Sequence, residues 1–109
     1  MARTVSRGEI WMYQFKAPNR RRPVLVLTRQ HVIDLLHWVM VAPITSAIHG
    51  IPSEVIIGVE EGLKGQSAIN LDNVQSVERS KLTHYVGSLD ASRMETVCRA
   101  LAVAAGCSD

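Results

Sequence analysis

The chain has 109 residues, of which 47% are hydrophobic and 20% are charged, and its formal net charge is +2. This length suits one domain with a single core, and the balance of apolar and charged residues excludes a disordered chain. No apolar run reaches the roughly 18 residues that span a bilayer, and the N-terminal stretch lacks the apolar segment of a secretion signal. We therefore expect one domain over residues 1–109 and a cytoplasmic location.

The chain has 2 cysteines and 4 histidines, which restricts its metal and redox chemistry. Cys98 and Cys107 fall in or at the end of one predicted helix, about 13 Å apart along its axis, which is beyond the reach of a disulfide. The histidines are scattered, and no cysteine pair has the spacing of a zinc site. We expect no disulfide, no bound metal and no cofactor.

Positive charge is concentrated near the N-terminus. Up to residue 29, Glu9 is the only acidic residue, whereas acidic residues outnumber basic ones in the rest of the chain. The basic residues of this first part are Arg3, Arg7, Lys16, Arg20, Arg21, Arg22 and Arg29. Such a local excess predicts an anionic partner at this end of the molecule.

The first half of the chain is predicted to form strands. Alternation favours a strand over residues 8–15, in which Trp11, Tyr13 and Phe15 share one face and are expected to join the core. After the turn "KAPNR", a run of aliphatic residues predicts a buried strand over 22–28, and a similar run predicts another over 37–45. The segment "QHVIDLL" between them is ambiguous, and a helical turn is slightly favoured over a strand.

The second half continues with short elements. A turn at 49–52 precedes a predicted strand over 53–59 and a glycine-containing loop over 60–66. Residues 67–77 are predicted to form a strand that bends near Asp72, and 81–89 form a further short element. Strands at this spacing predict a small closed or sandwiched sheet.

From Asp90 onward the hydrophobic period becomes that of a helix. Asp90 suits the N-cap position, and Gly106 suits the stop. The predicted apolar stripe consists of Met94, Val97, Cys98, Leu101 and Ala105, and the predicted polar face carries Arg93, Glu95 and Arg99. We expect this helix to cover one side of the sheet or barrel.

Three arginines stand directly before the first buried strand. Proline cannot donate to a strand ladder, so Pro23 is predicted to be the first strand residue, with Arg22 held in an extended conformation just outside it. Arg20 and Arg21 are expected in a loop, where they can reach a phosphate without being held in one geometry. Arg22 is therefore the candidate catalytic cation, and a solvated charge run is the alternative.

Two further polar stretches are candidates for a site. The adjacent hydroxyls of Thr45 and Ser46 end a predicted strand, where they either cap backbone groups or bind an oxyanion. Asp72 lies between the apolar residues Leu71 and Val74, and a carboxylate in apolar surroundings can act as a general base or acid. An Asp-Asn pair is also common in ordinary turns.

Four stretches in order along the chain resemble the MazF/PemK family of toxin endoribonucleases. They are "RGEIW" (7–11), "RPVLVL" (22–27), "PITS" (43–46) and "GL...SAINLDNVQSV" (62–77), and the likeness extends to the final helix. The resemblance implies a mainly β (α+β) fold, a small SH3-like β-barrel with the helix packed on it, working as a homodimer. It also implies metal-independent cleavage of single-stranded RNA, leaving a 2′,3′-cyclic phosphate and a 5′-hydroxyl.

The resemblance carries particular roles onto this chain. By motif, Arg22 and Thr45 match the catalytic pair, and Ser46 and Asp72 match positions near the same site. Asn70 stands where some members have an arginine. The family implies a cognate antitoxin whose extended acidic segment lies over the RNA groove, and the local excess of arginine suits such a ligand by charge.

Other residues are expected to contact RNA. The first loop is shorter here than in many members, so Arg20 and Arg21 are expected to supply more of the salt-dependent phosphate contacts. The usual Asp-Gln pair of the family appears as Asp-Asn in this chain. An imidazole suits acid–base chemistry near neutral pH, and the chain offers His31, His37, His49 and His84. By position, His31 after the arginine-bearing strand and His49 after Thr45 are further candidates, with a surface or packing role as the alternative.

The residues alone leave three other functions open. A toxin of the same fold that binds a protein target such as gyrase would have no use for the Arg22 and Thr45 pair. A non-catalytic RNA-binding module would not produce cyclic-phosphate ends, and an inactive member would neither cut RNA nor inhibit growth. The function we predict is an endoribonuclease that inhibits translation and growth.

Overall fold

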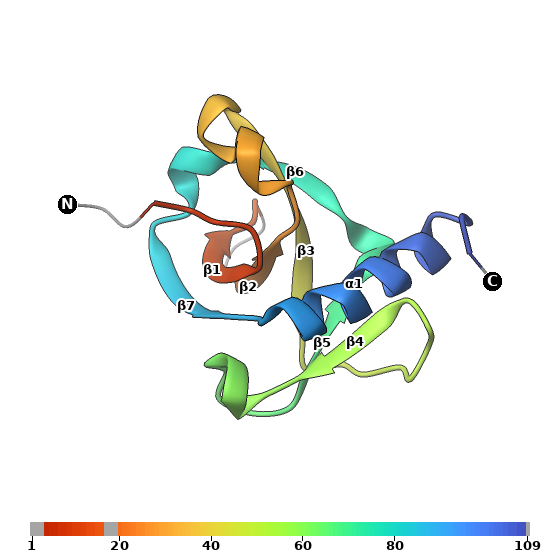
Figure 1. Ribbon diagram of the computed structural model, residues 1–109. Coiled ribbons are helices and arrows are strands. Elements are labelled where there is room, and N and C mark those ends of the chain that lie inside the picture. Colours follow the sequence, from red (N-terminus) through yellow and green to blue (C-terminus); the bar gives the residue numbers. More distant parts are fainter. Residues whose placement is uncertain (1–3, 17–19, 109) are drawn as a thin grey trace.

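The computed structural model describes residues 4–16 and 20–108, and its strands precede a single α-helix (Figure 1). The strands are β1 (Glu9–Gln14), β2 (Arg21–Val26), β3 (Trp38–Thr45), β4 (Glu54–Ile57), β5 (Ser67–Asn70), β6 (Gln75–Glu78) and β7 (His84–Ser88). The helix is α1 (Ala91–Ala104), and short 3₁₀ helices are η1 (Gln30–Leu35), η2 (Val59–Glu61), η3 (Leu71–Asn73) and η4 (Arg79–Lys81).

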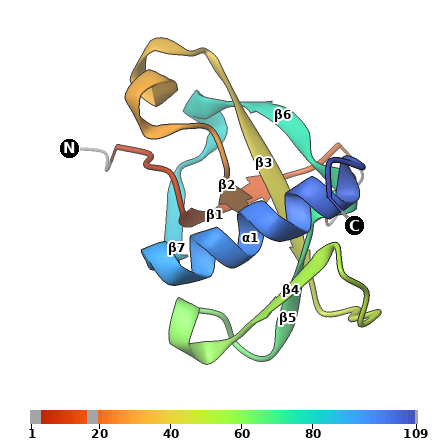
Figure 2. The same ribbon diagram turned by 45° about the vertical axis from the view of Figure 1, so that its right-hand side comes forward.

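The long strand β3 organises the sheet. Along one edge it pairs with β2, and along the other it pairs first with β6, over Trp38–Val41, and then with β5, at Ile44 and Thr45. The strand order is β4-β5-β3-β2-β1-β7, with β6 beside β3, and the pairs are antiparallel. Because β3 changes partner along its length, the sheet curls into a half-barrel (Figures 1 and 2). This agrees with the mainly β, barrel-like fold that the sequence predicts.

Both faces of the central strands are covered by apolar side chains. Along β2 and just beyond it, Leu25 and Leu27 join a core cluster that extends to α1, whereas Val24 and Val26 join a second cluster on the other face. Burial on both faces explains why this stretch is an unbroken aliphatic run.

The aromatic face of β1 lies on the second cluster, as predicted. Trp11 is buried, and Tyr13 and Phe15 are half-buried against the same cluster. The ring of Tyr85 on β7 meets the ring of Trp11 edge-on, with centroids 5.8 Å apart. The core role expected for these aromatic residues is confirmed, although Phe15 also borders a hollow described below.

Strand β2 begins earlier than predicted. Arg21 pairs with Gln14 and Arg22 with Tyr13, so Pro23 is not the first strand residue and Arg21 is not in a loop. Pro23 is tolerated inside the strand because the ladder between β2 and β3 starts only at Val24, so no bond to β3 is lost at the preceding residue.

The other predicted elements are found with small shifts. The ambiguous segment is the 3₁₀ helix η1, and the strand predicted over 53–59 is the shorter β4. The bend expected near Asp72 is the turn η3 between β5 and β6. The C-terminal helix starts as predicted, because the Asp90 Oδ1 accepts a hydrogen bond of 2.8 Å from the backbone N–H of Arg93.

The helix α1 packs beside β4 and η3 (Figure 2), but its buried stripe differs from the prediction. Met94 and Val97 are buried as expected, whereas Cys98 and Ala105 are exposed and Ala100 is buried in place of Cys98. Leu101 and Ala104 are partly buried against the same core cluster, so the buried stripe is slightly rotated from the predicted one.

Arg93 is not on the exposed polar face predicted for it. It is half-buried, its guanidinium donates to the backbone oxygen of Ile56 at 3.3 Å, and it lies 3.9 Å from the Glu61 carboxylate. Cys98 and Cys107 are free thiols. No helix in the described residues is long and apolar enough to cross a membrane.

The loop after η2 is pressed against β7. A Cβ atom on Gly87 would overlap the carbonyl oxygen of Glu61, and one on Gly62 would lie 2.5 Å from the carbonyl oxygen of Val86. Gly62 also has a φ of +98°, which disfavours other residues. These two glycines allow a close backbone contact that fixes the position of the loop.

We therefore expect Gly87→Ala to destabilise the fold by about 1–3 kcal/mol, because the added methyl group has no room. Gly65→Ala is the matched control in the same loop region, since a Cβ there meets nothing within 4 Å. Urea denaturation of both variants and the wild type measures the difference. Equal unfolding midpoints for the two variants would show that the contact imposes no constraint.

Candidate active site

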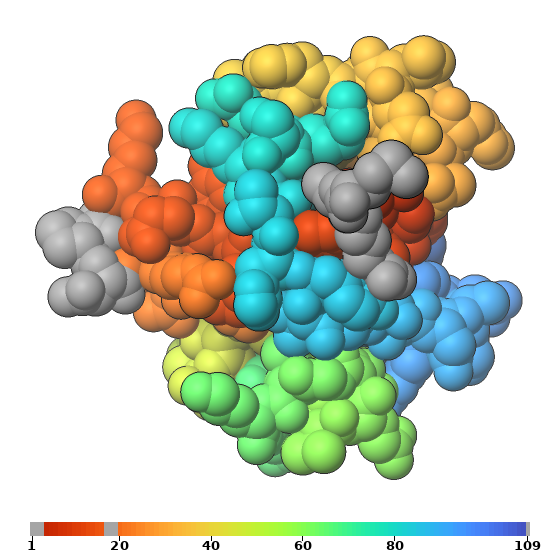
Figure 3. All heavy atoms as spheres, turned by 90° about the vertical axis from the view of Figure 1, so that its left-hand side faces the viewer, coloured from red at the N-terminus to blue at the C-terminus, as the bar shows by residue number. Residues whose placement is uncertain are grey.

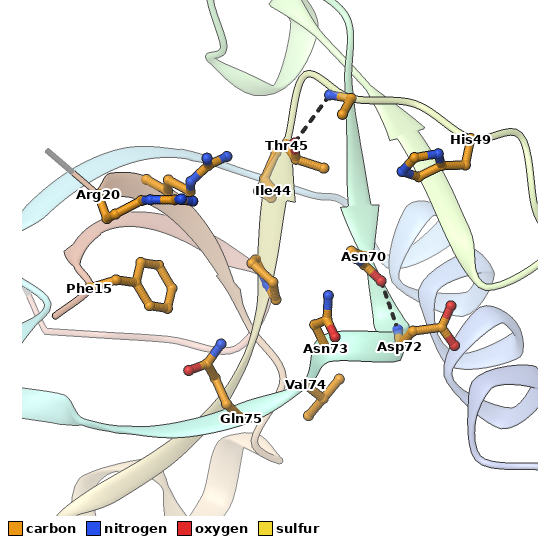
Figure 4. Close-up of a pocket in the computed structure, with 13 residues that line it drawn as sticks. Phe15, Arg20, Ile44, Thr45, His49, Asn70, Asp72, Asn73, Val74 and Gln75 are labelled. Carbon is orange, nitrogen blue, oxygen red and sulfur yellow. Dashed lines mark hydrogen bonds between the residues drawn. The ribbon is translucent and has the colours of Figure 1, made fainter. Parts of the chain in front are cut away.

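Two hollows meet where β2 begins and β3 ends. The first, of about 700 Å³, is lined by Phe15, Arg20, Arg22, Pro43, Ile44, Thr45, Ala47, His49, Asn70, Asp72, Asn73, Val74 and Gln75 (Figure 4). The second, of about 740 Å³, is lined by Met12, Arg21, Arg22, Pro23, Ile44, Thr45, Ser46, Gly62, Leu63, Lys64, Gly65, Gln66, Ser67, His84, Tyr85 and Val86. Arg22, Ile44 and Thr45 line both. The structure thus brings the two residues of the predicted catalytic pair together, at the boundary between two open hollows.

The start of β2 divides the three consecutive arginines between these hollows. Successive side chains of a strand point to opposite faces. Accordingly Arg20 lines the first hollow, Arg21 lines the second, and Arg22 reaches both. Arg22 is half-buried, whereas Arg20 and Arg21 are exposed, and none of the three forms an ion pair with a described carboxylate. Their charge is therefore available to a bound anion.

Thr45 is the last residue of β3 and pairs with Ala68 of β5. Its Oγ1 accepts a hydrogen bond of 3.1 Å from the backbone N–H of Ala47, so the capping interaction considered from the sequence is present. A hydroxyl that accepts through oxygen still has its hydrogen to donate. Thr45 can therefore cap the backbone and donate to a ligand at the same time. Ser46 is exposed and lines only the second hollow.

Asn70 precedes the turn η3, and Asp72 lies within it, at the far side of the first hollow. Asn70 Oδ1 accepts from the backbone N–H of Asp72 at 3.0 Å, which leaves the amide NH₂ of Asn70 to donate elsewhere. The Asp72 Oδ2 accepts from the Ser53 hydroxyl at 2.6 Å, and in Figure 4 the carboxylate points away from Arg20. The apolar surroundings predicted for Asp72 are not found, because its carboxylate is exposed while Leu71 turns into the core.

His49 lies in the loop after β3 and lines the first hollow. This loop is held by Glu54, whose Oε1 accepts from the backbone N–H groups of His49 at 2.9 Å and Gly50 at 3.0 Å. The backbone of His49 is therefore fixed while its exposed ring is directed by the loop toward the hollow (Figure 4). His31 lies on η1, beyond the opposite end of β2, and lines neither hollow.

Several lining residues could not be identified as site residues from the sequence. In the first hollow these are Phe15, which we expected only in the core, and the amides Asn73 and Gln75. In the second they are Lys64, Gln66, His84 and Tyr85. His84 and Tyr85 arrive there because β7 pairs with β1, with His84 opposite Met12. Because β1 and β7 are far apart in the sequence, no local sequence pattern indicates that they pair.

The charge at the two hollows suits an extended anion. The first hollow has Arg20 and Arg22 against the single carboxylate of Asp72, and the second has Arg21, Arg22 and Lys64 with no acidic residue among its lining. A continuous positive groove of this kind attracts a polyanion. Among the described residues, no group of three or more histidine, cysteine or acidic side chains is arranged to hold a metal ion.

Comparison with known proteins decides the family. Residues 6–105 match the model of the family described as PemK-like, MazF-like toxin of type II toxin-antitoxin system. The chain belongs to this family. The MazF/PemK resemblance noted in the sequence is therefore confirmed, and it extends over nearly the whole chain.

Two similar proteins named MazF support the assignment, and a third protein shares the fold. The chain is 41% identical over 104 residues to the probable endoribonuclease MazF5 of Mycobacterium tuberculosis (strain ATCC 25618 / H37Rv), covering 94% of each chain. Its fold superposes on that of M. tuberculosis toxin MazF-mt6 with a TM-score of 0.83 and 34% identity, covering 93% of this chain and 98% of the other. A mycobacterial endoribonuclease solved with its cognate antitoxin shares the fold at a TM-score of 0.83 and 23% identity, over 94% and 96% of the two chains.

Proposed function

We propose that this chain is a single toxin domain that cuts single-stranded RNA without a metal ion, as part of a type II toxin-antitoxin system. The observation that carries the proposal is the meeting of Arg22 and Thr45 at the boundary of two open, positively charged hollows. Its relatives include proteins named endoribonuclease at 41%, 32% and 36% identity. The rival view of a toxin that binds a protein target gives this polar pair no role.

The reaction needs three contributions. The ribose 2′-oxygen attacks the adjacent phosphorus and loses its proton to a base, charge on the phosphate must be stabilised, and the bond to the leaving 5′-oxygen breaks as that oxygen gains a proton. The products are a 2′,3′-cyclic phosphate and a 5′-hydroxyl. This reaction consumes no water and needs no metal ion.

Arg22 supplies the charge stabilisation. A guanidinium can donate two parallel hydrogen bonds to phosphate oxygens, and strand pairing with Tyr13 fixes its backbone before substrate arrives. Removal of one such prepositioned donor costs about 3–4 kcal/mol in comparable oxyanion sites. Thr45 donates its remaining hydrogen to the same phosphate, and the amide of Asn70 is a further donor within the first hollow.

His49 is the base in this proposal. Its ring lines the first hollow together with Arg22 and Thr45, and its loop is held by Glu54. Asp72 is assigned a positioning role, because one carboxylate oxygen is bound to Ser53 and its backbone N–H is bound to Asn70. Asp72 thereby orders the turn that presents the amide of Asn70 to the hollow.

The first experiment incubates wild-type protein with a long, structure-poor RNA in the presence of EDTA. Mapping by primer extension, with kinase labelling in the absence of phosphatase treatment, then reports the cut positions and their 5′-hydroxyl ends. Discrete cuts with such ends support the proposal. An intact RNA, or ends that carry a 5′-phosphate, would overturn it.

Arg22 and Arg21 are expected to differ in role. Arg22→Ala should reduce the cleavage rate constant at saturating RNA by 100-fold or more at an unchanged fold, on the order expected for a lost oxyanion donor. Arg21→Ala should mainly raise the RNA dissociation constant. The slope of log binding constant against log salt concentration should become shallower by about one, as expected for the loss of one phosphate contact. Cleavage and binding are measured at several salt concentrations. Equal losses of rate in both variants would contradict this division.

The assignment of the base is tested by rescue. His49→Ala should lose most of the cleavage rate, and added imidazole should restore part of it, because a small diffusible base can occupy the space left by the ring. Asp72→Ala should also be slower, because it removes the acceptor of the Ser53 hydroxyl at the η3 turn, but neither imidazole nor acetate should restore its rate. Rescue of Asp72→Ala by acetate, without rescue of His49→Ala by imidazole, would reverse the two roles.

The partners follow from the same proposal. The exposed arginines suit an antitoxin with an extended acidic segment, which would cover the groove and block RNA. A messenger RNA target implies a cytoplasmic location. We also propose that the toxin is a homodimer that buries the exposed apolar side chains of η1 and β3, where Leu35 is 81% and Trp38 is 53% exposed, with Leu36 and Met40 beside them.

A dimer through this surface should dissociate when Trp38 is replaced by Glu, because the new carboxylate stands opposite Glu78 on β6 and is desolvated at the interface. Light scattering after gel filtration gives the molar mass. Val59→Glu is the control, since this apolar residue on η2 is 73% exposed and lies outside the surface. A dimeric Trp38→Glu variant, or a monomeric wild type, would exclude this interface.

A further inference from the structure

The second hollow is as large as the first, and the chemistry proposed above does not use most of it. A phosphate held by Arg22 and Thr45 lies at the boundary of both hollows, since these two residues line each of them. An RNA strand has a nucleotide on either side of every phosphate. When one neighbouring nucleotide occupies the first hollow, the second is the adjoining site for the other, because Arg22 and Thr45 line both.

The walls of the second hollow are held in place by strand pairing and by a close backbone contact. One wall is β7, which is fixed by its pairing with β1, with His84 opposite Met12. The opposite wall is the loop that carries Lys64 and Gln66, and the Gly62–Gly87 contact holds this loop against β7. Figure 3 shows the start of β2 (orange), β7 (cyan) and the loop after η2 (green) bordering one region of the surface.

The side chains in this hollow are those that recognise a nucleotide. Tyr85 brings an aromatic ring that is half-buried, and its edge-to-face contact with Trp11 holds it in place. His84 and Gln66 carry donor and acceptor atoms that match the edges of bases, and both are exposed. Arg21 and Lys64 bring positive charge for the backbone. Proteins that read single-stranded RNA use this combination of ring, hydrogen-bonding groups and cations.

We infer that the second hollow binds one of the two nucleotides flanking the cut bond, and that His84 and Gln66 select its base. Tyr85 packs against the base, and Arg21 and Lys64 hold the neighbouring phosphates. The volume of about 740 Å³ is within the range of small-molecule sites and accommodates a nucleotide. This inference rests on the proposed ribonuclease function and adds to it the residues that determine specificity at one position.

The experiment sequences the ends of a randomised RNA pool after cutting by wild type, His84→Ala and Gln66→Ala. Wild type should prefer particular bases on both sides of the cut. Each variant should lose about tenfold of that preference at the same single position, as expected for loss of a side-chain contact to a base edge, with the other positions unchanged. His37→Ala is the matched control, because it removes an exposed imidazole that lines neither hollow.

A variant that cuts too slowly to map is tested by binding. The same proteins select from a random library of 2′-deoxy oligonucleotides, which cannot be cut, and the bound pool reports the same base preference. Unchanged preference in both His84→Ala and Gln66→Ala, by cutting or by binding, would overturn the inference while leaving the proposed function intact. A wild type that leaves the RNA uncut overturns the proposed function and the inference with it.

Discussion

The arrangement of this protein depends on the pairing of β3 with β2 on one edge and with β6 and then β5 on the other. Pairing with β2 brings the last residue of β3, Thr45, to the same end of the sheet as Arg22. The exchange of β6 for β5 makes room for the turn η3, which presents Asn70 at the same place. Backbone hydrogen bonds thus assemble a site from three stretches of chain that lie far apart in the sequence.

Around this site, groups that order the structure are separated from groups that remain available to a ligand. Carboxylates are used mainly for order: Glu54 holds the loop of His49, and Asp72 is bound to Ser53. Arg20, Arg21 and Arg22 form no ion pair with a carboxylate among the described residues. This separation matters for a polyanion, because every acidic group committed to the backbone or a hydroxyl is one fewer group to neutralise an arginine or repel the substrate.

Periodicity and capping signals were enough to predict most of the fold. The alternating β1, the aliphatic β2, the bend near Asp72 and the Asp90 cap are local patterns, and each is found where the pattern indicates. The errors arose where tertiary contacts decide. Pro23 is tolerated inside a strand because of where the β3 ladder begins, and the rotation of α1 is chosen by its packing.

The site was predicted in part for the same reason. Arg22, Thr45, Asn70 and His49 were identifiable by motif or position, and the fold brings them to one hollow. His84 and Gln66 were not, because the strand and loop that carry them reach the site only through contacts with β1 and between Gly62 and Gly87. His31 lines neither hollow, since proximity in sequence to β2 does not determine which end of that strand a residue occupies.

The run of three arginines has a consequence for how this protein can evolve. Three identical residues in a row suggest that one arginine could be lost while the others keep its role. Each arginine, however, has a different position, because Arg20 lines only the first hollow, Arg21 lines only the second, and Arg22 lines both. Loss of any one of these side chains therefore removes positive charge from a different part of the site, so the repeat offers no redundancy.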